Sequence, residues 1–335
     1  MKEKKIIDTG SGISPLGPSN KVKASIRRAI KEIKYVPDGP IKNLERFFMS
    51  KFGLPYDRIL FANSVSELAC AIIRTFRPGR VLVLGPALRL YEEAASRAGA
   101  EVLYFDTDEG SGFAADTDKL ISSLDGSELI FVANPNRITG KLHSDATLAR
   151  ISNSASEKNV FLVIDESLVE FTGEYIFNPA ALVQENVITI KTTAFFYGLP
   201  GLELAYAVSG PSTIRSLRTG RDWSLNTLSA VAAKTALKDE TYRKHIHRFI
   251  ADEKELLSRE MEKVGGLICF KTDSNVYLVK LENFAERLMK VFLGAGFLIR
   301  DCGDISGLGK SFLRLSVMSH DKNLKLLRLM KELVR

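Results

Sequence analysis

The chain has 335 residues, 45% of them hydrophobic and 26% charged, which is an ordinary globular composition and enough for a large and a smaller domain. Mean hydropathy is near zero and no stretch approaches the roughly 20 apolar residues of a membrane span, so we expect no membrane-spanning helix. The formal net charge is +7, but the basic residues are scattered, which argues against a nucleic-acid partner and favours a basic surface suited to phosphorylated small molecules.

The start of the chain and its cysteines and histidines point to no special class of protein. MKEKKIIDTG carries basic residues but no apolar run behind them, so we expect no signal peptide and a cytoplasmic protein. Cys70, Cys269 and Cys302 show neither CxxC nor metal spacing, and their odd number argues against a disulfide framework. His245 and His247 lie two apart on an expected helix and face different directions. We predict no metal site.

From about residue 58, apolar strands alternate with amphipathic helices. The expected strands are 58–62, 81–85, 101–105, 128–134, 160–166, 187–190 and 203–210, with helices from near Ser64, through Glu92–Arg97 and near Asp145–Glu157. Short apolar strands separated by helices are typical of a parallel sheet covered on both faces.

After residue 210 the pattern changes to that of an α+β unit. A long charged helix is expected at Thr241–Val264, strands at 266–270, 275–281, 297–301 and 312–317, and helices at 284–294 and Asn323–Val334. No low-complexity linker separates the two parts, so we expect them to pack closely.

Ligands of an open parallel sheet bind beyond the carboxyl ends of its strands, which here means 63–66, 85–91, 134–140, 165–168 and 191–201. Asp165 ends an apolar strand, where a carboxylate is costly unless it has a cationic or hydrogen-bonding partner. A functional role for Asp165 is therefore favoured.

Two of these segments allow both a binding and a purely structural interpretation. The amides of Ser64, Val65 and Ser66, at a helix N-terminus, could bind an anion. Ser64 and Glu67 equally have the spacing of a capping box. Asn134-Pro135-Asn136 indicates a turn first and a ligand contact second.

Several segments, in order, resemble the class I/II aminotransferases. ANPNRITG (133–140) resembles their NPNNPTG loop, VIDESLVEF (163–171) their DEAYxxF strand end, IKTTAFFYGLPGLELAYAV (190–208) their lysine segment RSxSKxxGLPGLRLGY, and RDWSLNTLSAVAAKTAL (221–237) a helix of the family. DTGSGISPLGPS (8–19) and LIRDCGDISGLGKSFLRLSV (298–317) look closest to the threonine-phosphate decarboxylase branch. The resemblance covers essentially the whole chain.

The chain thus resembles fold-type-I pyridoxal-phosphate (PLP) enzymes of the histidinol-phosphate aminotransferase and threonine-phosphate decarboxylase kind. This implies an aspartate-aminotransferase-like α/β large domain with a mixed, mostly parallel sheet, plus a smaller α+β domain, in a homodimer. The implied division is an N-terminal segment at 1–40 that contributes to the small domain and dimer interface, a large PLP-type domain at 41–240 and a small domain at 241–335.

Some working residues of the family are matched here. Asp165 matches the aspartate that pairs with the pyridinium nitrogen of PLP. Thr192 matches a hydroxyl that contacts the cofactor phosphate, to which the amides of 64–66 would add. Arg314 matches the arginine that binds the substrate carboxylate as a bidentate pair.

Other positions depart from the family pattern. Phe195 occupies the position of the Schiff-base lysine, which holds PLP and moves the α-carbon proton, and phenylalanine can do neither. Glu203 stands in place of an arginine that neutralises the cofactor phosphate, so an attraction becomes a repulsion. Further departures are Ala194 for a phosphate-binding hydroxyl, Arg137 for an asparagine and Leu168 for a tyrosine at the ring oxygen, Leu88 for a stacking aromatic, Gly12 and Ser14 for asparagines, and Val36 for a tyrosine unless Tyr35 replaces it.

Lys191 could replace the missing lysine only if the alignment slipped by four residues, which would break the GLPG register. Three hypotheses follow, in order of preference. The first is a pseudoenzyme that binds PLP weakly or not at all and binds a small anionic or amino-acid-like ligand between Arg137, Thr192 and Arg314, or serves as a partner subunit. The second is an active PLP-dependent aminotransferase or amino-acid-phosphate decarboxylase with a non-standard base. The third is new, non-PLP chemistry in the same pocket.

Overall fold

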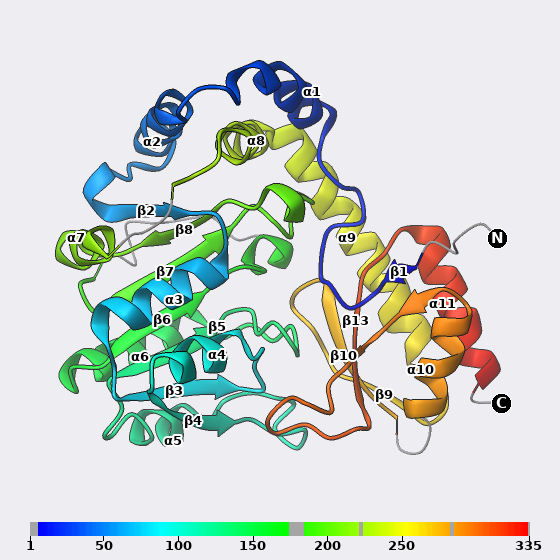
Figure 1. Cartoon of the computed structure of the whole chain (residues 1–335). Coiled ribbons are helices and arrows are strands. Elements are labelled where there is room, and N and C mark those ends of the chain that lie inside the picture. The colour runs from blue at the N-terminus through cyan, green and yellow to red at the C-terminus, as the bar shows by residue number, and fades with distance from the viewer. Residues whose placement is uncertain (1–5, 174–183, 221–223, 282–284, 334–335) are drawn as a thin grey trace.

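The computed structural model describes residues 6–173, 184–220, 224–281 and 285–333 (Figure 1). A seven-stranded sheet, the large sheet, has the order β2 (Ile59–Ala62), β8 (Ala205–Val208), β7 (Val187–Thr192), β6 (Phe161–Asp165), β5 (Leu129–Ala133), β3 (Arg80–Gly85) and β4 (Glu101–Asp106). Neighbouring strands run parallel except that β8 is antiparallel to both β2 and β7. The expected mixed, mostly parallel sheet is confirmed.

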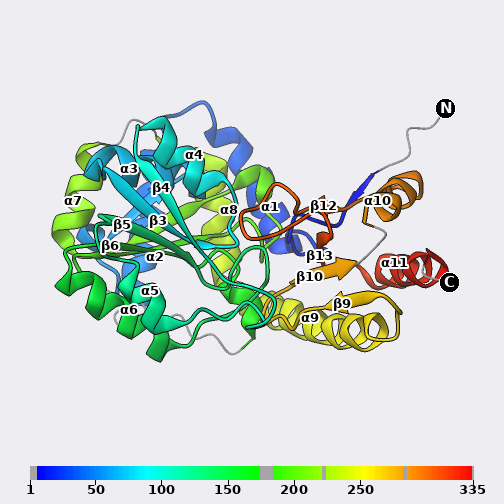
Figure 2. The same ribbon diagram turned by 90° about the horizontal axis from the view of Figure 1, so that it is seen from below.

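Helices cover both faces of the large sheet, which explains why its central strands are apolar throughout. Figure 2 shows α3 (Val65–Phe76) and α4 (Leu90–Arg97) on one face and α5 (Thr117–Ser122) and α6 (Asp145–Glu157) on the other. The other helices of this part are α1 (Asn20–Ala29), α2 (Asp38–Phe52), α7 (Pro211–Thr219) and α8 (Thr227–Lys238). N-cap side chains such as Ser19, Ser144 and Asn226 begin α1, α6 and α8 by accepting a backbone N–H.

A second, antiparallel sheet, the small sheet, has the order β12 (Arg300–Asp301), β13 (Phe312–Ser316), β10 (Val276–Leu281) and β9 (Leu267–Cys269). It is accompanied by α9 (Glu240–Met261), α10 (Ala285–Gly294) and α11 (His320–Leu333). The single strand expected at 297–301 is wrong. β11 (Phe297–Leu298) pairs in parallel with β1 (Ile7–Asp8), whereas β12 pairs with β13, because the chain passes from one ladder to the other at Ile299.

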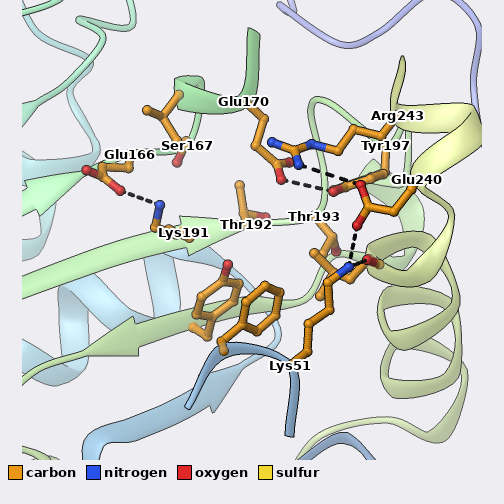
Figure 3. A pocket seen from close by; sticks show the side chains of 14 residues that line it. Lys51, Glu166, Ser167, Glu170, Lys191, Thr192, Thr193, Tyr197, Glu240 and Arg243 are labelled. Carbon is orange, nitrogen blue, oxygen red and sulfur yellow. Dashed lines mark hydrogen bonds and ion pairs between the residues drawn. The ribbon is translucent and has the colours of Figure 1, made fainter. Parts of the chain in front are cut away.

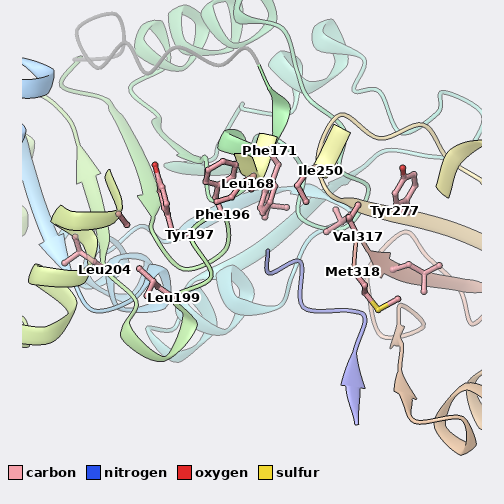
Figure 4. Packing of buried hydrophobic residues seen from close by; sticks show 14 of the residues in the cluster. Leu168, Phe171, Phe196, Tyr197, Leu199, Leu204, Ile250, Tyr277, Val317 and Met318 are labelled. Carbon is pink, nitrogen blue, oxygen red and sulfur yellow. The ribbon is translucent and has the colours of Figure 1, made fainter. Parts of the chain in front are cut away.

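One hydrophobic core joins the two sheets, as the lack of a linker predicted. Figure 4 shows side chains of the β7–β8 connection and of the segment after β6 packed in one cluster with residues of α9, of β10 and of the segment just after β13. Members of this cluster are Phe196, Tyr197, Leu199, Leu204, Leu168, Phe171, Ile250, Tyr277, Val317 and Met318. The loops that follow β6 and β7 are therefore held from both sides.

Two glycines allow close approaches that a side chain would prevent. A Cβ at Gly140 would lie 2.0 Å from Thr272 Oγ1, so the loop after β5 touches a loop of the small sheet. A Cβ at Gly198, in the GLPG turn, would lie 2.6 Å from the Cα of Gly17, and its φ of +64° also favours glycine. Among the described residues, no helix is long and apolar enough to cross a membrane.

Candidate functional site

Asp165 lies at the carboxyl end of β6 and is buried, with the polar partners that the sequence required. Its Oδ1 accepts hydrogen bonds from the Ser167 hydroxyl and from the Ser167 backbone N–H, the latter at 2.8 Å. Its Oδ2 accepts one from the Tyr91 hydroxyl at 2.5 Å. Tyr91 stacks on Phe131, and burial together with Asp165 raises the pKa of the Tyr91 hydroxyl, so it stays a donor. These partners, Tyr91 and Ser167, were not identified from the sequence.

Arg137 brings a positive charge to this carboxylate. Its Nη1 lies 3.5 Å from Asp165 Oδ2, and its guanidinium carbon lies 4.7 Å from the centroid of the Phe195 ring. The Arg137 side chain is only 11% exposed. Because water screens it little, the pair interacts more strongly than a surface ion pair would. Asp165, Arg137 and Phe195, all singled out in the sequence, therefore meet at one place.

The loop that carries Arg137 is fixed by its asparagines. Asn136 Oδ1 accepts the N–H groups of Ile138 and Thr139, and its amide donates to the Pro86 carbonyl at 2.9 Å. Asn134 Oδ1 accepts the N–H of His143 at 2.7 Å. The interpretation of Asn134-Pro135-Asn136 as a turn is confirmed.

The amide that opens α3 is bound by a carboxylate of the chain itself. Glu203 Oε1 accepts hydrogen bonds from the Val65 backbone N–H at 3.3 Å and from Thr192 Oγ1 at 2.8 Å. Thr192, expected to contact a phosphate, thus donates to Glu203 in this structure. Burial raises the pKa of Glu203, and the hydrogen bonds from Thr192 and Val65 only partly offset this effect.

The rest of the 63–66 segment forms a helix cap. Ser64 Oγ accepts the Glu67 N–H at 3.1 Å, and the Glu67 carboxylate accepts the Asn63 N–H at 2.7 Å. Ser66 is exposed in the first turn of α3. The capping interpretation is therefore confirmed, and Glu203 accounts for one amide of the expected anion site.

Lys191 lies on the other face of the large sheet. It is opposite Tyr206 in the β7–β8 ladder, whereas Thr192 is opposite Ala205, and successive side chains of a strand point to opposite faces. Its Nζ lies 2.5 Å from Glu166 Oε2, and both side chains are buried (Figure 3). Burial lowers the pKa of Lys191 despite the nearby Glu166.

This pair borders a cavity of about 50 Å³, whose lining also includes Ser167 and Thr192. In Figure 3 the same cavity is lined by Glu170, which accepts a hydrogen bond from Tyr197 at 2.9 Å, and by Arg243. Burial raises the pKa of Glu170. The cavity is small and its charged groups largely balance one another.

Arg314 lies on β13 and reaches the N-terminal segment. A Cβ at Gly12 would lie 3.2 Å from Arg314 Nη2, and Gly12 has a φ of +72°, so glycine leaves room for the guanidinium. Burial, followed by the positive charge of Arg137, lowers the pKa of Arg314 to about 10. Within the described ranges, no carboxylate lies within ion-pair distance of Arg314, and its Nε has no hydrogen-bond partner.

The remaining predicted positions are dispersed. Leu88 packs beside Phe113 and Ile138 in a cluster that also contains small-sheet residues, and Leu168 is buried in the core that joins the sheets. Tyr35 and Val36 are both exposed. Residues 221–223 of the expected RDWSLN motif lie outside the described residues. The described part of the chain contains no group of three or more His, Cys, Asp or Glu side chains that could hold a metal ion.

Comparison with known proteins gives a consistent result along the whole chain. Residues 4–329 match the family model of class I and II aminotransferases. A putative threonine-phosphate decarboxylase of Caldanaerobacter subterraneus subsp. tengcongensis is 26% identical, over 96% of this chain and 89% of the relative.

Solved structures agree. The histidinol-phosphate aminotransferase of Clostridium acetobutylicum is 26% identical with a TM-score of 0.90, covering 98% of this chain and 99% of that one. The histidinol-phosphate aminotransferase of Sinorhizobium meliloti, in complex with pyridoxal-5'-phosphate, has a TM-score of 0.90 at 21% identity, covering 99% and 92%. The fold is aspartate-aminotransferase-like, and PLP is the cofactor of the family. The chain therefore belongs to the class I and II aminotransferase family, with relatives among the histidinol-phosphate aminotransferases and threonine-phosphate decarboxylases.

Proposed function

We propose that this protein keeps the aminotransferase fold but forms no internal aldimine with PLP, and that it is a pseudoenzyme whose pocket binds a small anionic molecule. The observation that carries the proposal is the position of Arg137, which lies over the Phe195 ring and pairs with Asp165. Asp165 is the residue that the family resemblance assigns to the pyridinium nitrogen. A side chain of the protein thus supplies the positive charge that the ring would bring.

The residues present do not fit the cofactor at three of its attachment points. Phe195 offers no amine for an imine bond. Glu203 binds the Val65 amide and the Thr192 hydroxyl, groups expected to face the phosphate, and its carboxylate would repel a phosphate. Arg137 adds a cation beside Asp165. We accordingly expect PLP to bind weakly or not at all.

The alternative of an active enzyme would need a base other than residue 195, and Lys191 is the lysine nearest to it in sequence. Its ammonium group lies on the opposite face of β7 from Thr192 and is paired with Glu166. To reach Asp165, the side chain would have to pass through the large sheet. This geometry supports the pseudoenzyme over the active enzyme. Homodimer formation and a cytoplasmic location remain predictions.

The decisive experiment is the ultraviolet–visible spectrum of the purified protein with and without PLP, followed by borohydride reduction. We expect the sum of the spectra of protein and free PLP, and no specific peptide labelled by reduction. Because free PLP also reacts with surface lysines, the Lys191→Arg variant serves as the control. A stable aldimine band that disappears in Lys191→Arg would overturn the proposal.

A gain-of-function variant tests whether the fold could still hold the cofactor. The combined substitutions Phe195→Lys, Arg137→Asn and Glu203→Arg restore the family's residues at the three altered attachment points. We expect this variant, unlike the parent, to develop an aldimine band that borohydride fixes at residue 195. If the variant gave no such band, these three positions would not be what prevents PLP chemistry.

A further inference from the structure

Three buried polar side chains near the Asp165 site have atoms without partners in the described part of the chain. They are Arg314 Nε, Arg137 Nε and Ser14 Oγ, and the side chains of Arg314 and Ser14 are only 5% and 3% exposed. Buried polar groups in proteins are almost always hydrogen-bonded, so unmet donors at one place indicate that something else binds there.

The N-terminal segment connects these groups. The Ser14 N–H donates to the Phe195 carbonyl at 2.9 Å, and the Phe195 ring lies under the Arg137 guanidinium. Gly12, two residues earlier, is the residue beside Arg314 Nη2, and its carbonyl is held by the Asn275 amide at 2.8 Å. The segment from Gly12 to Ser14 thus links the surroundings of Arg314 and Arg137, and the charge of Arg137 contributes to the lowered pKa of Arg314.

The acidic side chains near Arg137 and Arg314 cannot satisfy both arginines. Asp165 Oδ1 accepts twice from Ser167, and Oδ2 accepts from Tyr91 while lying 3.5 Å from Arg137. Glu203 is directed to Val65 and Thr192. Further acceptors must come from water or from a bound molecule, and among bound groups a planar carboxylate matches a guanidinium fork best.

The same surroundings disfavour two other kinds of ligand. An amino acid would place an ammonium group, a third cation, beside Arg137 and the apolar side chains of Phe195 and Leu168, where desolvation and repulsion oppose it. A phosphorylated ligand would meet Glu203 at the amide of α3 that could otherwise bind its phosphate.

We propose that Arg314 and Arg137 form a site for a small organic acid without an α-amino group, and that a dicarboxylate engaging both guanidinium groups is its preferred class. This inference rests on the proposed function, because an amine substrate would be needed if PLP chemistry took place.

Glutarate and glutamate test it directly, since they share a carbon skeleton and differ in the α-ammonium group. In calorimetric titrations of the purified protein without added PLP, we expect glutarate to bind at least about tenfold more tightly than glutamate, the equivalent of one charged hydrogen bond lost. Inorganic phosphate is expected to bind more weakly than glutarate. Equal or tighter binding of glutamate or phosphate would overturn the proposal, as would the absence of glutarate binding.

Variants locate the site. Arg314→Gln and Arg137→Gln should each weaken glutarate binding by about tenfold or more, whereas Arg150→Gln, a surface arginine paired with Asp118, should leave it unchanged. Arg314→Lys keeps the charge but loses the fork, so an intermediate loss is expected, and it replaces Arg314→Gln should that variant not fold. Binding within twofold of the parent in Arg314→Lys and Arg137→Gln would place the acid elsewhere. An aldimine with PLP would refute the proposed function, but it would not affect these titrations made without PLP.

Discussion

The two ends of the candidate site, at Glu203 and at Arg314, differ in how their charges are satisfied. At one end Glu203 accepts hydrogen bonds from the Val65 amide and from Thr192. At the other end Arg314 is buried on β13 and, among the described residues, has no acid within ion-pair distance. Between them Asp165 and Arg137 form a pair. The Glu203 end is therefore completed by the protein, whereas the Arg314 end needs a partner from outside.

This contrast distinguishes a site that has only lost its catalytic residue from one in which the protein has formed new contacts in its place. A site that had only decayed would be expected to leave buried donors unmet at both ends. Here the Glu203 end has an internal hydrogen-bond acceptor, which satisfies the Val65 amide at the helix terminus without a ligand. The cost of a buried, unpaired cation at the Arg314 end persists in the free protein, as is common where binding has been kept at the expense of stability.

Asp165→Ala is expected to have the largest effect on stability. It removes the carboxylate that accepts hydrogen bonds from Tyr91 and Ser167 and pairs with Arg137, leaving a buried cation and two buried hydroxyls without this acceptor. We expect the free energy of unfolding to fall by about 3 kcal/mol or more, measured by urea denaturation. Asp165→Asn keeps the shape and one acceptor, so a smaller loss is expected. A loss below about 1 kcal/mol in Asp165→Ala would mean that the Arg137 pair contributes little.

Arg314→Met should change stability in the opposite direction. It replaces a buried, unpaired cation by an apolar side chain of similar length, so the free energy of unfolding of the ligand-free protein should rise by about 2 kcal/mol. Urea denaturation without and with glutarate checks this: glutarate should stabilise the parent and have no effect on the variant. A destabilised variant would show that Arg314 is satisfied in the free protein.

Most of the fold could be predicted from the sequence because its strands and helices are locally consistent. Helix α6 begins and ends at the predicted residues, and the strands of the large sheet lie close to theirs, whereas α5 and α7 were not expected. The division of 297–301 into two short strands could not be predicted, since it depends on β1, which is nearly 300 residues away in sequence and pairs with β11.

The site residues were recognisable one by one, but their partners were not. The family pattern singles out four positions: Asp165 matches it, whereas Arg137, Phe195 and Glu203 depart from it. Their partners depend on which strand ends the sheet order brings together. Glu203 accepts from Thr192 and Val65, and Tyr91 donates to Asp165. Ser167 was closer to prediction, because a hydroxyl two residues after an aspartate commonly bonds to it.

Glu203→Gln is expected to have the smallest effect on stability, and it tests how the ionisation of Glu203 affects the folded protein. Because the pKa of folded Glu203 is raised above its ordinary value of 4.5, the folded state holds this proton more tightly, and stability falls as pH rises from 4.5 through the folded pKa. Glutamine can still accept from Val65 and Thr192 but does not ionise. We expect it to stabilise the protein by about 1 kcal/mol or less near neutral pH and to make no difference below the ordinary carboxyl pKa. Glu185, an exposed residue before β7 whose carboxylate accepts hydrogen bonds at the start of α7, is the matched control. Some desolvation would raise its pKa, but hydrogen bonds from Ser212 and Thr213 outweigh this and lower it, so Glu185→Gln should be destabilising at neutral pH. Urea denaturation over this pH range measures the free energy of unfolding of both variants. If Glu203→Gln were also destabilising at neutral pH, the ionised form of Glu203 would be stabilising at the start of α3.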